Sequence, residues 1–137
     1  MTDEEAIRDV VARYNLYGDS GRISEMLDLF ADDATLTVDG TAYDGKDAIR
    51  SLFETAVGPV PELIRHHTST LVIDVARDKA VAQCYFQVLT SQGLDHWGRY
   101  RDALVRVHHR WLFARREVRV DGMTPGGWAA QRGHDAP

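Results

Sequence analysis

The chain has 137 residues, 44% of them hydrophobic, and a formal net charge of −5. That length suits one domain with a single buried core, and the interspersed acidic and basic residues argue against a nucleic-acid partner. Cys84 is the single cysteine, which excludes an internal disulfide and favours a cytoplasmic location; no apolar run is long enough to predict a membrane span.

Two helices are expected at the start of the chain. Thr2 and Glu5 have capping-box spacing, and apolar residues then recur at helical intervals, so a first helix is predicted up to Gly18. Ser20 or Ser24 is the expected cap of a short second helix that ends near residue 30.

The rest of the chain is predicted to be mostly β-structure. Residues 34–40 alternate and end in a turn, and Asp44 is the expected cap of a third helix. Three β-rich runs follow, over residues 66–75, 80–91 and 97–118. The last run is too long for one strand, so a turn is expected at His108 and His109. Helices on one face of a mainly antiparallel sheet, an α+β fold, are therefore predicted.

Residues 1–124 are expected to form this domain, and the Gly- and Pro-rich residues 125–137 a flexible C-terminal tail in which only Trp128 has a reason to pack.

Three segments, residues 4–40, 65–70 and 98–118, resemble in order and spacing the SnoaL-like domains of the nuclear transport factor 2-like superfamily. Within that superfamily the pattern is similar to scytalone dehydratase and to hexachlorocyclohexane dehydrochlorinase, which are lyases without a cofactor. The resemblance implies a cone-shaped α+β barrel, in which a curved, mainly antiparallel sheet wraps around helices and encloses an internal pocket.

The resemblance also implies catalytic residues. In the two lyases an aspartate after the first helix faces a histidine on the strand after the third helix, and Asp19 and His66 occupy those places. Arg116 matches an arginine on the final strand of the dehydrochlorinase. A neutral imidazole can take a proton from an activated carbon, a carboxylate can hold it in one tautomer, and a cation can stabilise the negative charge that develops.

The pocket wall is predicted from alternation along the strands. If His66 points inward, Thr68 and Thr70 do so too, while His67 points away. Arg116 is expected to share its side with Leu112, Ala114 and Val118. The residues expected to contact substrate are Tyr14, Phe86, Val88, Thr90, Tyr100 and Asp102.

Several of these residues also have structural interpretations. Tyr14 could be a core residue, His66 an ordinary strand histidine and Asp19 a loop residue that bonds to local amides. Asp102 could pair with Arg106 or Arg116 instead of contacting substrate, because an inward carboxyl group needs a partner. Arg116 could be bonded to Asp19, to Asp102 or to the C-terminal carboxylate.

The predicted function is that of a lyase of the dehydratase type, which needs neither cofactor nor metal and acts on a small apolar or cyclic, polyketide-like substrate. An isomerase or polyketide cyclase would use the same two residues, and a non-catalytic module for small-molecule binding or dimerisation is the third possibility. Assembly into a homodimer or homotrimer is expected.

Overall fold

The computed structural model describes residues 1–56 and 61–133. Its four helices are α1 (Asp3–Asp19), α2 (Ile23–Leu27), α3 (Lys46–Ala56) and α4 (Trp128–Arg132). Its six strands are β1 (Phe30–Val38), β2 (Thr41–Asp44), β3 (Ile64–Ala76), β4 (Lys79–Thr90), β5 (Gly93–Val107) and β6 (Arg110–Met123). Among these described residues, no helix is both long and apolar enough to cross a membrane.

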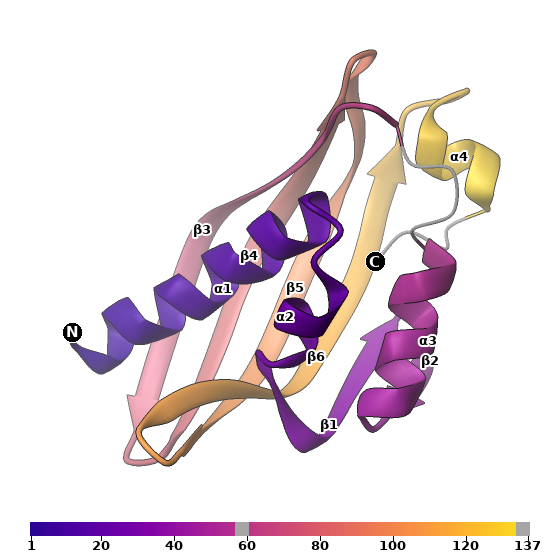
Figure 1. Ribbon diagram of the computed structural model, residues 1–137. Helices are drawn as coiled ribbons and strands as arrows, with labels where there is room; N and C mark the ends of the chain where they lie inside the picture. Colours follow the sequence, from indigo (N-terminus) through magenta and orange to yellow (C-terminus); the bar gives the residue numbers. More distant parts are fainter. Residues whose placement is uncertain (57–60, 134–137) are drawn as a thin grey trace.

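The strands form one curved sheet in the order β2-β1-β6-β5-β4-β3. Strands β1 and β6 run parallel, and every other neighbouring pair is antiparallel. Helices α1, α2 and α3 cover one face of the sheet, while α4 lies beyond the end of β6 (Figure 1). The α+β fold with a mainly antiparallel sheet and helices on one face is therefore confirmed.

Several local predictions are confirmed as well. Thr2 and Glu5 form the capping box of α1, since each side chain bonds to the backbone of the other residue. His108 and His109 make the turn between β5 and β6, with φ angles of 48° and 66°. Four long strands follow one another in hairpins from β3 to β6, as expected.

The predicted caps of α2 and α3 are wrong. The N-cap of α2 is Arg22, which makes no capping hydrogen bond through its side chain. Asp44 ends β2, a short strand that the sequence did not indicate, and its carboxylate accepts a hydrogen bond from Thr35 Oγ1 at 2.8 Å. The turn dipeptide Asp39–Gly40 joins β1 to β2 directly, because Asp39 adopts a φ of 46° and Gly40 one of 90°.

Two irregularities change which side chains face inward. The pairing of β3 with β4 shifts between Ser69 and Val72, so Thr70 has a φ of 55° and is exposed instead of facing the pocket. The pairing of β5 with β6 shifts between Phe113 and Arg115, so buried Arg116 follows Phe113 on the inner face, while Leu112 and Ala114 are only partly buried. A bulge breaks strict alternation, which explains both wrong predictions.

The C-terminal segment contains α4, which packs against the end of the sheet through Ala129, 1% exposed. Asp95 on β5 accepts hydrogen bonds from the first backbone N–H groups of this helix, Trp128 N at 2.7 Å and Ala129 N at 3.1 Å. Residues 134–137 of the predicted tail lie outside the described residues.

Candidate active site

Asp19 and His66 meet although 47 positions separate them in the chain. Asp19 is the last residue of α1, and His66 lies near the start of β3. One oxygen of Asp19, Oδ1, lies 2.6 Å from His66 Nδ1, and the other, Oδ2, accepts the backbone N–H of His66 at 2.9 Å. Because a carboxylate accepts hydrogen bonds, Nδ1 carries the proton in this contact and Nε2 is the basic nitrogen of the neutral ring.

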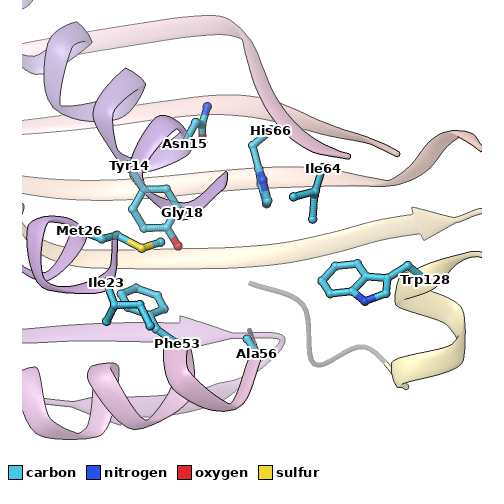
Figure 2. A pocket seen from close by; sticks show the side chains of 10 residues that line it. All are labelled: Tyr14, Asn15, Gly18, Ile23, Met26, Phe53, Ala56, Ile64, His66 and Trp128. Carbon is cyan, nitrogen blue, oxygen red and sulfur yellow. The ribbon is translucent and has the colours of Figure 1, made fainter. Parts of the chain in front are cut away.

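A pocket lies beside this pair. The pocket has a volume of about 60 Å³. One water needs about 10–15 Å³ counted in the same way, so the pocket has room for several waters. The His66 ring and the Tyr14 hydroxyl enter the same space, and Trp128 of α4 closes one side (Figure 2). The residues that line it are mostly apolar: Tyr14, Asn15, Gly18, Ile23, Met26, Phe53, Ala56, Ile64, His66 and Trp128.

Tyr14 offers a hydrogen-bond donor to this pocket. Its hydroxyl has no hydrogen-bond partner among residues 1–56 and 61–133. Burial raises the pKa of Tyr14 to about 12, although the positive charge of Arg116 opposes the shift. The phenol is therefore a neutral O–H group at any ordinary pH. Its ring is fixed by edge contacts with four aromatic rings, those of Phe30, Phe53, Tyr100 and Phe113.

Arg116 lies one layer behind Tyr14. Its guanidinium is 4.2 Å from the centre of the Tyr14 ring and 3.7 Å from that of Tyr100. Arg116 Nε and Nη2 donate to the two carboxylate oxygens of Asp102 at 3.0 and 3.3 Å, since the two residues are direct partners on β6 and β5. Both side chains are 0% exposed. Of the alternatives left open by the sequence, the pairing of Asp102 with Arg116 is the one found.

This buried pair is electrostatically unusual. Burial raises the pKa of Asp102 to about 6, even though Arg116 opposes the shift. Arg116 Nη1 has no hydrogen-bond partner in the described part of the chain. The pair therefore places a positive charge behind the Tyr14 ring without itself lining the pocket.

The other residues predicted to contact substrate do not line the pocket. Phe86 stacks on Tyr100 with ring centres 4.6 Å apart, and both are 0% exposed. Val88 is 0% exposed within the core, and Thr90 Oγ1 accepts a hydrogen bond from the backbone of Gln92. Of the predicted site residues, the structure places Tyr14 and His66 on the pocket wall, with Asp19 bonded to His66, and none of these four lines the pocket.

Sequence reasoning missed His96, which is 0% exposed beside His66. Their ring centres are 6.4 Å apart, with the rings nearly perpendicular. The sequence did indicate an inward position for His96, because the alternation that points Tyr100 inward continues through Gly98 to His96. Gly98 is small for a reason: an added Cβ would lie 1.9 Å from the Arg119 carbonyl oxygen.

The pocket residues that the sequence did not indicate come mainly from α1, α2 and α3, whose apolar stripes are indistinguishable from ordinary core in sequence. Among the residues whose positions the structure gives, no group of three or more His, Cys, Asp or Glu side chains could hold a metal ion.

Comparison with known proteins identifies the family. The model of the SnoaL-like domain matches residues 1–117. The chain belongs to the SnoaL-like domain family. None of the curated proteins is similar enough in sequence to match it.

Solved structures agree with this assignment. An NTF2-like protein with a cystatin-like fold from Novosphingobium aromaticivorans is 27% identical, with a TM-score of 0.74 over 95% of this chain and 87% of that one. A candidate scytalone dehydratase from the same species is 25% identical, with a TM-score of 0.79 over 89% and 86%. A Mycobacterium tuberculosis protein of unknown function is 24% identical, with a TM-score of 0.87 over 97% and 91%. This SnoaL-like chain thus has the NTF2-like cone fold and a scaffold similar to that of a candidate dehydratase.

Proposed function

We propose that this SnoaL-like protein is a cofactor-independent lyase of the dehydratase type. The observation that carries the proposal is the 2.6 Å contact between Asp19 Oδ1 and His66 Nδ1 at the wall of a mostly apolar pocket. Similarity to a candidate scytalone dehydratase supports the same reaction class. A small cyclic or polyketide-like β-hydroxyketone is the substrate class that this chemistry fits.

In the proposed reaction, His66 Nε2 takes the proton from the carbon next to the substrate carbonyl. Asp19 keeps Nδ1 protonated and stabilises the imidazolium that forms. The electron pair of the broken C–H bond then makes the C=C bond as the β C–O bond breaks. The imidazolium returns its proton to the departing hydroxide, so that water leaves and the neutral base is restored.

Tyr14 is proposed to donate a hydrogen bond to the carbonyl oxygen, where negative charge develops in the transition state. Its neutral hydroxyl suits that role because it enters the pocket without another partner in the described residues. Arg116 is proposed to act through Tyr14: a positive charge 4.2 Å from the ring centre makes the phenol a stronger donor. Asp102 holds the guanidinium in that place.

The test is a screen of cyclic β-hydroxyketones, followed by the ultraviolet absorbance of the conjugated enone and by mass spectrometry for the loss of water. His66→Ala is expected to lose turnover by about 1,000-fold or more, in line with the contribution of general base catalysis. His67→Ala is the matched control, because His67 is the next residue on β3 and is exposed. The proposal would be contradicted if His66→Ala dehydrated a substrate of the parent protein as fast as the parent protein does.

A further inference from the structure

A second imidazole–carboxylate pair lies directly behind the first. His66 on β3, Val88 on β4 and His96 on β5 are partners in one row across the sheet. His96 Nδ1 lies 2.8 Å from Asp95 Oδ2, and the side chains of His96 and Asp95 are 0% and 2% exposed. The mechanism proposed above gives this second pair no task.

The state of the His96 ring follows from its partners. Asp95 uses both carboxylate oxygens to accept backbone N–H groups of α4 and therefore acts as an ionised acceptor. Nδ1 of His96 must then donate to it. Burial lowers the pKa of His96, although Asp95 opposes the shift, so the ring is neutral at pH 7 and Nε2 carries a lone pair.

That lone pair is not used within the fold. His96 Nε2 is buried and has no hydrogen-bond partner among the described residues. An unsatisfied buried acceptor costs about 1–3 kcal/mol, and native proteins rarely leave one without a bound partner. The surroundings suggest where a partner would come from. The ring centre of His96 is 6.4 Å from His66 and 6.2 Å from Trp128, and both of these residues line the pocket.

We propose that His96 is a further substrate-binding residue, whose Nε2 accepts a hydrogen bond from a hydroxyl group of a ligand lying between His66 and Trp128. Asp95 is its positioning residue. A neutral imidazole acceptor favours an O–H donor and disfavours a carbonyl or ether oxygen, because two lone pairs would then face each other. The inference rests on the proposed function for the pocket and narrows its substrate class to molecules with a free hydroxyl group.

The same carboxylate also connects this residue to α4. Asp95 caps the helix that carries Trp128, so the wall of the pocket and the tautomer of His96 depend on one side chain. Asp95→Asn keeps a capping oxygen for α4 but no longer requires Nδ1 to donate. This variant is therefore expected to lose the single tautomer of His96 while α4 stays in place.

The test compares phenol with toluene, which has a similar shape and lacks the hydroxyl, in protein labelled with ¹⁵N at histidine. In the parent protein, phenol is expected to shift the His96 Nε2 resonance, and toluene is not. His96→Phe, which also assigns the resonance, should weaken phenol binding about 3- to 10-fold, the equivalent of one neutral hydrogen bond, and should not weaken toluene binding. Asp95→Asn should weaken phenol binding to a similar degree.

Saturating phenol that leaves the His96 resonance unmoved would overturn the inference. If phenol then moves only the His66 resonances, the hydroxyl-binding role of His96 fails while the proposed base stands. Through-bond assignment of the His96 ring in the parent protein gives this result without a variant, so a His96→Phe variant that does not fold leaves the test intact. The screen for enone formation checks the proposed function separately, because this binding measurement needs no turnover.

Discussion

Two carboxylates in this molecule each bind a basic side chain, and they do so at different depths. Asp19 binds His66 at the pocket wall, where the side chains keep 10% and 13% of their exposure. Asp102 binds Arg116 in the layer beneath, where both side chains are completely buried. The imidazole of the first pair lines the pocket, whereas the deeper pair contacts only other protein groups.

The difference shows that a similar chemical pairing has different surroundings at different depths. An imidazole at a pocket wall is a type of side chain that can exchange a proton with a ligand. A fully buried arginine stays positively charged, so it affects its neighbours only through the electrostatic potential of that charge. Tyr14 joins the two levels, because its hydroxyl enters the pocket and its ring covers Arg116.

The largest expected effect is on turnover at the pocket wall. Asp19→Asn should lower kcat about 1,000- to 10,000-fold, because the amide no longer fixes the His66 tautomer or stabilises the imidazolium. The melting temperature should change little, since an asparagine oxygen can still accept the His66 backbone N–H. Steady-state kinetics and calorimetry check both. Asp9→Asn, an exposed position on the same helix, is the matched control and should retain activity.

At the deeper pair the largest expected effect is on stability. Arg116→Met leaves the Asp102 carboxylate buried without its partner and should lower the free energy of unfolding by about 3–5 kcal/mol at pH 7. Urea unfolding measures this. A change below about 1 kcal/mol would show that the deep pair is less important to the fold than its burial indicates.

The pH dependence sharpens that prediction. Because burial raises the folded-state pKa of Asp102 to about 6, its contribution to stability is full below its ordinary pKa near 4 and is lost as pH rises through about 6. Loss of Arg116 removes the charge that opposes this shift. The deficit of Arg116→Met relative to the parent protein should therefore shrink as the pH falls from 8 to 5, and a deficit that grows would contradict this account of Asp102.

A smaller effect is expected at Tyr14, which lies between the pocket and the buried Arg116. Tyr14→Phe keeps the ring over Arg116 and removes only the hydroxyl, so kcat should fall about 10- to 100-fold, the equivalent of a hydrogen bond to a charged group. The free energy of unfolding should stay the same or rise slightly. Tyr17→Phe on the same helix is the control, because the Tyr17 hydroxyl bonds to Arg13 outside the pocket.

The last prediction concerns chemical access to the side chains beneath the pocket and does not involve turnover or stability. Burial raises the pKa of Cys84 to about 11, so at pH 8 the folded protein should react with iodoacetamide about 100-fold more slowly than the unfolded chain. Mass spectrometry over time measures the rate. Equal labelling of folded and unfolded chains would mean that the layer around Asp102 and Arg116 is open.

Much of the fold could be predicted because local signals and global structure agree. Two features depend only on residues that are close together in the sequence: the capping box of Thr2 and Glu5, and the turn at His108 and His109. The bulges near Thr70 and Arg115 could not be predicted, because each depends on the pairing of two strands. The prediction from strict alternation was therefore wrong about which side chains on β3 and β6 are exposed and which are buried.

The candidate site was predicted in part. Resemblance to a family placed Asp19 and His66 at matching positions, and the geometry brings them together. Depth was not predictable: alternation says which face a side chain occupies but not whether a helix covers it, so Phe86 and Val88 were expected at the pocket and do not line it. His96 was readable from the alternation through Tyr100, but its pairing with Asp95 depends on α4, for which the tail sequence gave no indication beyond Trp128.

Asp19 and His66 are proposed to work as one unit in proton abstraction. The most direct measurement is a double-mutant cycle on kcat with a turned-over β-hydroxyketone, using His66→Ala, Asp19→Asn and the double variant. The double variant is expected to be no slower than His66→Ala, because an orienting carboxylate has no effect once its imidazole is gone. Losses that multiply independently would contradict the claim.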